Sequence, residues 1–288
     1  MSNYVIYTDS GSDIKPELLS EWGVRSVALT FRFAEEDKEY SDNEMSVKTF
    51  YDKMREGGVA KTAAVNVQMF KAAFEQALGE GLDVLYIGFS SGLSTTFNSA
   101  HLAAKELSES YPERKIITVD GLSASAGQGL LVNLAVKKKN GGAAIDELAE
   151  YVEGIKLSIC HWFTVDDLVY LKRGGRINPA TAFVGNLLGI KPVLHVDDAG
   201  HLVNVSKVRG RKAALSALAD KYGEFAIERD GGIAYISNAD CLDDAQYLSV
   251  LLKERYNATV EVITDVGTVI GAHAGPGTMA LFFVGSKR

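Results

Sequence analysis

Residues 84–94 read VLYIGFSSGLS, an apolar run of strand length that ends in a turn of serine and glycine. A helical period of apolar residues precedes it at residues 68–78, another follows at residues 98–107, and a further β-branched run stands at residues 116–119. Because strands that alternate with helices form parallel sheets, this order predicts βαβ units. With the apolar run at residues 4–7, the first half of the chain is expected to be a Rossmann-like α/β fold around a mostly parallel sheet.

Each of the three predicted strands is followed by a turn of small and polar residues, at residues 8–12, 90–94 and 120–125. The carboxyl ends of neighbouring parallel strands meet at one edge of a sheet, which is where open α/β sheets bind their ligands. The three turns therefore predict a binding site at that edge.

The pattern changes at about residue 157, where strands become more frequent. Six strands and two helices are expected there, the strands at residues 158–164, 193–196, 202–206, 232–237, 259–264 and 278–284 and the helices at residues 213–222 and 243–255. The turn signal at residues 197–200 indicates a hairpin and hence a mixed sheet. Since 288 residues are enough for one core to split into two, we expect an N-terminal α/β domain at residues 1–156 and a C-terminal α/β domain at residues 157–288.

Charge and cysteine content exclude several classes of protein. Acidic residues outnumber basic ones, 37 against 30, so the net charge of -7 disfavours nucleic acid and anionic membranes as partners. The sequence has neither an 18-residue apolar stretch nor an N-terminal signal sequence, so stable membrane insertion and export are not expected. Cys160 and Cys241 are too few and too far apart for a disulfide framework or a metal site, and a reduced, cytoplasmic location fits them.

Residues 88–92 fit the pattern G-x-S-x-G at a strand-to-helix junction, which is the setting of the nucleophilic serine in α/β hydrolases. In that interpretation Ser90 or Ser91 is the nucleophile, His273 is the base, and a downstream aspartate completes a triad. Many chains offer this order of residues by chance. A serine hydrolase or acyltransferase is therefore kept as the alternative function.

The serine-rich turn has a second interpretation, because hydroxyls and free N–H groups at the start of a helix bind anions such as carboxylates. Ser91, Ser94 or Thr95 also fit the simpler role of capping the following helix, and this alternative remains open. Complete phosphate-binding glycine motifs are missing from the sequence, so no nucleotide cofactor is expected. Asp9 and Asp13 flank a turn that suits a cation, but an Asx turn and a helix cap explain them better, so no metal is expected.

Two segments of the second half carry further candidates. Lys172, Arg173 and Arg176 form a compact cationic group around two glycines, which fits either a contact surface for an acidic partner or a solvated loop after a helix. Residues 269–277 are small and rich in glycine, and they predict a rigid loop that presents His273 from an apolar strand.

Six motifs, in order along nearly the whole chain, resemble those of the DegV family of lipid-binding proteins, the fatty acid-binding (FakB-type) subunits of bacterial fatty acid kinase. They stand at residues 7–14, 90–94, 119–129, 170–177, 190–194 and 270–277. Each motif is weak alone, and their order makes the resemblance specific.

The resemblance implies two α/β domains that enclose a long-chain fatty acid at or near their interface, without a cofactor and without catalysis by this chain. It assigns the fatty acid carboxylate to Thr62, Ser94 and His273. Further candidates for the ligand site, all on or after the serine-rich turn, are Ser91, Thr95 and Asn98. Hydroxyl and N–H donors suit a buried carboxylate because they stabilise it without burying a second full charge.

In this family the bound acid is phosphorylated on its carboxyl by a separate ATP-binding subunit related to dihydroxyacetone kinases, which yields an acyl phosphate for phospholipid synthesis. By analogy, Lys172, Arg173 and Arg176 are expected to dock that kinase subunit.

The chain departs from the family's usual sequence beside the predicted site. Residues 63–66 have lost hydroxyl side chains next to Thr62, and Thr95, Phe97 and Gly121 replace more common residues. These departures leave the preferred chain length and unsaturation of the fatty acid open.

Overall fold

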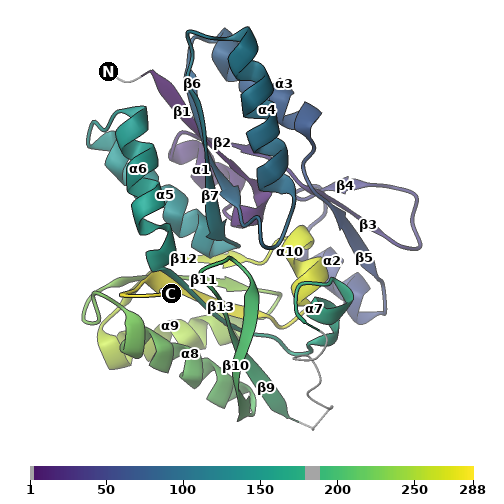
Figure 1. Ribbon diagram of the computed structural model, residues 1–288. Helices are drawn as coiled ribbons and strands as arrows, with labels where there is room; N and C mark the ends of the chain where they lie inside the picture. Colours follow the sequence, from purple (N-terminus) through teal and green to yellow (C-terminus); the bar gives the residue numbers. More distant parts are fainter. Residues whose placement is uncertain (1–2, 179–188) are drawn as a thin grey trace.

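The computed structural model describes residues 3–178 and 189–288, and its upper half in Figure 1 is built on a four-stranded sheet. The strands are β1 (Tyr4–Asp9), β2 (Val24–Val27), β6 (Asp83–Phe89) and β7 (Ile116–Ser123). Their order is β2-β1-β6-β7, and every neighbouring pair is parallel. The parallel sheet predicted from residues 84–94 and their flanking helices is confirmed.

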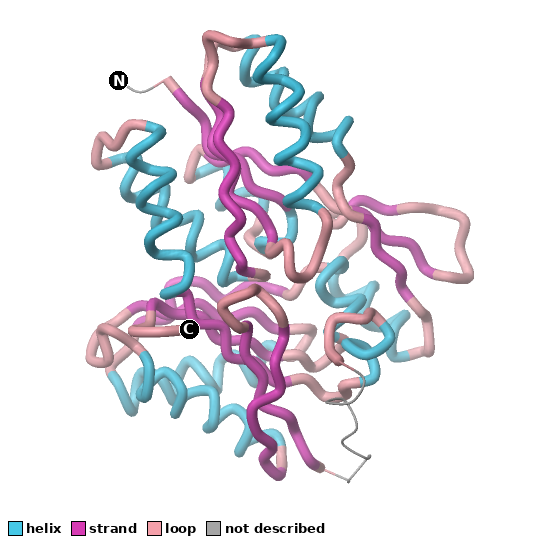
Figure 2. The backbone as a smooth tube through the Cα atoms, in the orientation of Figure 1, coloured by secondary structure: helices cyan, strands magenta, loops and turns pink. Residues whose placement is uncertain are grey.

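Helices cover both faces of this sheet, as Figure 2 shows. They are α1 (Pro16–Glu21), α3 (Val67–Gly79), α4 (Thr96–Ser110), α5 (Ala126–Asn140) and α6 (Ile145–Ile155). Val5 and Tyr7 of β1 pack in the core with α3 and α4, whereas Tyr4 and Ile6 pack with α5 and α6. Alternate residues of a strand point to opposite faces, so a strand between two helix layers is buried throughout, as β1 is.

A small antiparallel sheet, which was not predicted, lies beside the first. It contains β3 (Thr30–Phe33), β4 (Tyr40–Ser41) and β5 (Ala60–Ala63) in the order β4-β3-β5, and α2 (Val47–Arg55) packs nearby. These strands are short, and β5 alternates half-buried and exposed residues without an apolar run. The sheet matters for the site because β5 carries Thr62.

The lower half of Figure 1 holds a six-stranded mixed sheet. Its strands are β8 (Ile159–Thr164), β9 (Ile190–Val196), β10 (Leu202–Arg209), β11 (Ile233–Asn238), β12 (Thr259–Asp265) and β13 (Met279–Val284), in the order β10-β9-β8-β13-β11-β12. Only β11 and β12 pair in parallel among the described strands of this sheet. The predicted hairpin is present as β9 and β10, and the mixed sheet is confirmed.

Helix α5 lies between the two large sheets. The outer face of the mixed sheet is covered by α8 (Arg211–Phe225) and α9 (Leu242–Tyr256), and its inner face packs on α5. Leu130, Leu131 and Val132 of α5 share one core with residues of both large sheets, such as Ile87 and Phe282. Most residues of α5 from Ala126 to Val136 are buried, as expected of a helix that is covered on several sides.

The predicted domain boundary at residue 156 falls between α6 and β8. Strands of the first two sheets come from residues before it and strands of the mixed sheet come from residues after it. The division into domains at residues 1–156 and 157–288 remains a prediction.

No helix within residues 3–178 and 189–288 is both long enough and apolar enough to cross a lipid bilayer.

One local prediction was wrong, because most of residues 269–277 form a helix instead of a loop. Helix α10 (Thr268–Ala274) begins where Asp42 accepts hydrogen bonds from the Val269 N–H at 2.9 Å and from the Thr268 hydroxyl at 2.6 Å. It ends at Gly275, which has a φ of +83°. The cap comes from a residue far away in the sequence, so local composition did not reveal the helix.

Candidate functional site

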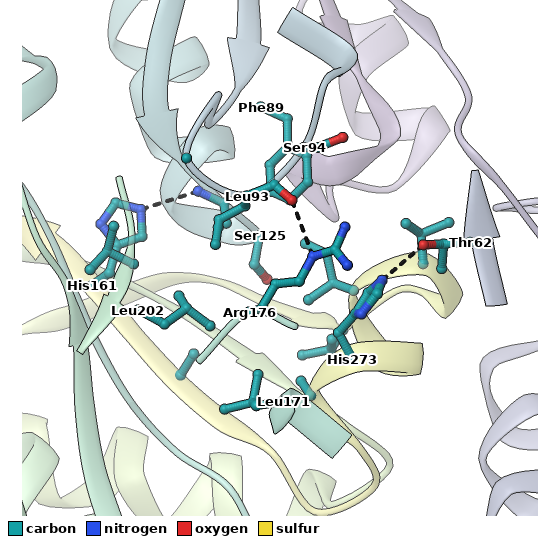
Figure 3. Close-up of a pocket in the computed structure, with 18 of the residues that line it drawn as sticks. Thr62, Phe89, Leu93, Ser94, Ser125, His161, Leu171, Arg176, Leu202 and His273 are labelled. Carbon is teal, nitrogen blue, oxygen red and sulfur yellow. Dashed lines mark hydrogen bonds between the residues drawn. The ribbon is translucent and has the colours of Figure 1, made fainter. Parts of the chain in front are cut away.

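A cavity of about 490 Å³ opens where the turn after β6, β5, α10 and the mixed sheet meet. Most of its wall is apolar, with contributions from residues such as Leu29, Phe89, Leu202 and Phe282. Figure 3 shows polar side chains gathered at one end, where Thr62, Ser94, Arg176 and His273 lie close together; we call this the polar end.

His273 and Thr62 form the central pair of the polar end. Nε2 of His273, on α10, lies 2.8 Å from Oγ1 of Thr62, on β5. Burial and the nearby positive charge of Arg176 lower the pKa of the imidazole to about 4, so the ring is neutral at pH 7. Nδ1 of the ring is buried without a hydrogen-bond partner.

The partners of His273 determine where its proton lies. An unpaired buried N–H costs more than an unpaired lone pair, so the neutral ring carries its proton on Nε2 and donates it to Thr62. The hydroxyl proton of Thr62 then remains available for a ligand. The pair therefore presents a polarised, uncharged donor to the cavity.

Ser94 lies at the same end of the cavity, two residues before helix α4 begins. Its Oγ accepts a hydrogen bond from the Thr96 N–H at 3.2 Å and lies 2.9 Å from the Thr96 hydroxyl. The capping interpretation and the binding interpretation thus apply to the same hydroxyl. Of the further candidates, Ser91 and Thr95 line the cavity, whereas Asn98 is exposed and does not.

Ser90 is not arranged as a nucleophile. Its side chain is 0% exposed, and its hydroxyl donates to the Gly200 carbonyl at 2.9 Å while accepting from the Gly92 N–H. Ser91 faces solvent, and its N–H donates to Asp120. In the described part of the chain His273 is paired with Thr62 and with neither serine.

The cationic group predicted as one surface is divided by the structure. Lys172 and Arg173 are exposed at the end of α7 (Val169–Arg173). Arg176 turns into the cavity instead, where its Nε donates to the Leu93 carbonyl at 3.2 Å and its Nη1 donates to the Gly174 carbonyl. Burial lowers the pKa of the Arg176 guanidinium, which nevertheless keeps its charge at neutral pH.

The far wall of the cavity contains two polar residues that were not among the named candidates, His161 and Ser125, although Ser125 lies in the predicted turn at residues 120–125. His161 donates from Nδ1 to the Ile159 carbonyl at 2.8 Å, and burial lowers its pKa well below the usual range. Ser125 has a φ of +55° and a ψ of -149°, a strained conformation for a residue with a side chain. Its hydroxyl donates to Asp13 and lies 2.9 Å from the Ser237 hydroxyl, and these contacts hold the strained turn in place.

Asp9, the last residue of β1, and Asp13, shortly after it, have structural roles. Asp9 accepts from the Gly11 N–H at 2.9 Å, which is an Asx turn, and also from the Tyr86 hydroxyl and the Phe89 N–H. Asp13 accepts from the Gly267 N–H at 3.0 Å. Within the described residues, acidic, histidine and cysteine side chains do not gather into a group that would hold a metal ion.

Comparison with known proteins identifies relatives over the whole length. The model of the DegV family, described as uncharacterised proteins, matches residues 3–286. A DegV domain-containing protein of Clostridium perfringens is 40% identical over 100% of this chain and 99% of its own.

Solved structures share the fold. A DegV lipid-binding protein of Thermotoga maritima has a TM-score of 0.88 at 31% identity and covers 100% of both chains. A DegV family protein of Thermus thermophilus, described for its fatty acid binding, has a TM-score of 0.88 at 30% identity over 98% of this chain and 99% of its own. DegV of Bacillus subtilis, a fatty acid-binding protein, has a TM-score of 0.84 at 29% identity over 99% of this chain and 100% of its own.

Proposed function

The chain belongs to the DegV family, and from this premise we propose that it binds a long-chain fatty acid in its cavity, with the carboxylate at the polar end. The observation that carries the proposal is the His273–Thr62 pair, a neutral donor set at one end of an otherwise mostly apolar cavity. Three related structures support it, because they are described as lipid-binding or fatty acid-binding proteins.

The two ends of the cavity suit the two parts of such a ligand. A tail of about 16 carbons at ~0.8 kcal/mol per buried CH2 supplies about 12 kcal/mol of gross driving force, from which the costs of association are subtracted. The carboxylate meets hydroxyl donors from Thr62 and Ser94, and the charge of Arg176 offsets its own. Charge-assisted hydrogen bonds of this kind are the strong ones in a dry site.

In this proposal the chain holds the acid without reacting with it. The buried, carbonyl-bonded hydroxyl of Ser90 speaks against the alternative, a serine hydrolase or acyltransferase. A separate ATP-binding kinase subunit phosphorylates the carboxylate to an acyl phosphate that feeds phospholipid synthesis. This chain then needs no nucleotide cofactor.

Mass spectrometry tests the binding function directly. Protein purified under native conditions is expected to release one intact long-chain fatty acid per chain when it is denatured, because the ligand is enclosed and not covalently attached. Delipidated protein is expected to take up one equivalent again. A protein that never retains a fatty acid, and whose Ser90 or Ser91 is labelled by a fluorophosphonate, would contradict the proposal and favour the hydrolase.

Kinase docking is expected to depend on the exposed end of α7. Arg173→Glu should lower the rate of kinase-dependent acyl phosphate formation about tenfold, because it reverses a charge on the proposed contact surface. Fatty acid binding should be unchanged, since the Arg173 side chain is exposed and absent from the cavity wall. Lys105→Glu on α4 makes the same charge change elsewhere and is the control. Equal rates for the Arg173 variant and the wild type would discard this docking surface.

A further inference from the structure

The segment of residues 170–176 lies across the polar end of the cavity. Its inner side reaches the site, since Leu171 and Arg176 line the cavity and the Gly174 backbone contacts His273. Its outer side carries Lys172 and Arg173, which are exposed. Figure 3 shows Arg176 beside His273 at this end.

Position 174 requires a glycine because of its contact with His273, and not because of its backbone conformation. Its φ of -71° and ψ of -10° suit any residue. A Cβ on Gly174, however, would overlap Nδ1 of His273 and lie 3.0 Å from its Cγ. Only a glycine lets the chain approach the edge of the imidazole this closely.

Arg176 connects the same segment to the opposite side of the polar end. Its Nε donates to the carbonyl of Leu93, the residue before Ser94, and its Nη1 donates to the carbonyl of Gly174. One guanidinium thus joins the backbone beneath His273 to the turn that carries Ser94. The planar, five-donor geometry of arginine suits it to span two carbonyls.

We propose that Gly174 is a positioning residue for the fatty acid carboxylate. Its backbone supports the Nδ1 edge of His273, which keeps Nε2 at hydrogen-bond distance from Thr62. Arg176 fixes the position of Gly174 relative to the turn that carries Ser94. The inference rests on the proposed function, in which Thr62 and Ser94 receive the carboxylate. It gives the glycine of the cationic segment a role in recognition of the ligand.

The physical basis is the small space available to the ring. His273 is held between Gly174 at one edge and Thr62 at the other. Adding a methyl group at residue 174 forces the imidazole to rotate or shift, because protein interiors are close-packed. The 2.8 Å contact with Thr62 cannot survive such a movement in its present geometry.

The chain offers a matched pair of variants, Gly174→Ala and Gly175→Ala. Gly175 has a φ of +69° and open space around its Cβ position, so alanine there strains the backbone without touching His273. In ligand-free protein, Gly174→Ala is expected to change the NMR signals of the His273 ring and to weaken fatty acid binding at least tenfold. Gly175→Ala is expected to leave the ring signals unchanged and binding within about twofold, although it lowers the melting temperature.

A double-mutant cycle covers the case in which Gly174→Ala folds poorly. In a His273→Ala background the ring is absent, so adding Gly174→Ala should cost little further stability. If the two changes destabilise the protein additively, or if Gly174→Ala leaves both the ring signals and binding as in the wild type, the proposal is wrong. If the ring signals change but the wild type itself binds no fatty acid, the positioning role stands and the proposed function falls.

Discussion

Replacing Thr62 by valine is expected to weaken fatty acid binding at least tenfold while leaving the fold intact. Valine has the same shape as threonine and suits a strand, so β5 should still pair with β3. The variant loses the hydroxyl that accepts from His273 and that, in the proposed function, donates to the carboxylate. It also leaves the His273 N–H buried and unpaired. A hydrogen bond to a charged group contributes about 1.5–3 kcal/mol, and about 1.4 kcal/mol already corresponds to tenfold.

The measurement is the dissociation rate of a bound fatty acid, followed as it transfers to an acceptor protein in excess. Thr62→Ser is the matched control, because it keeps the hydroxyl and removes only a methyl group. Serine is expected to stay within about threefold of the wild type. Valine and serine variants that release the ligand equally slowly would show that the Thr62 hydroxyl does not hold the carboxylate.

Replacing Arg288 by alanine is expected to lower the free energy of unfolding by about 3 kcal/mol, because several partly buried carbonyls lose a charged donor. The Arg288 side chain is half-buried and makes five hydrogen bonds. They go to the carbonyls of Leu122, Lys156, Ile159 and Asp197, at 2.7, 2.7, 3.1 and 3.2 Å, and to the hydroxyl of Ser123 at 3.2 Å. Burial lowers the pKa of this guanidinium to about 10, so it stays charged at pH 7.

Urea denaturation measures this effect, with Lys287→Ala as the control. The Lys287 side chain is exposed, and its contact with the Phe225 ring should contribute less than about 1 kcal/mol. Arg288→Lys keeps the charge but offers three donors instead of five, so it should recover only part of the loss. A loss below about 1 kcal/mol in Arg288→Ala would mean that the five contacts are not important for stability.

The sequence predicted elements whose pattern is local and repeated. β1, β6 and β7 were found because apolar strand runs alternate with helical periods. The sheet of β3, β4 and β5 was missed because its strands are short and lack that pattern. Such strands are stabilised by their neighbours, which a single-sequence pattern does not include.

The candidate site was less accessible to sequence reasoning because its contacts join distant residues. Thr62 and His273 are 211 positions apart, and only the resemblance to a family suggested that both belong to one site. Helix α10, which carries His273, was predicted as a loop because Asp42 caps it from 226 positions away. Arg176 was grouped with Lys172 and Arg173 by charge, whereas in the structure it lines the cavity and bonds the Gly174 carbonyl.

The position of β13 has a consequence for protein synthesis. This strand pairs with β8 and β11 in the middle of the mixed sheet, and its Ala280 and Phe282 line the cavity. Residues 279–288 leave the ribosome after every other strand of that sheet, so a nascent chain that lacks them has a gap between β8 and β11. The cavity wall is therefore complete only after β13 has been synthesised, so the cavity cannot enclose a ligand before that strand has left the ribosome.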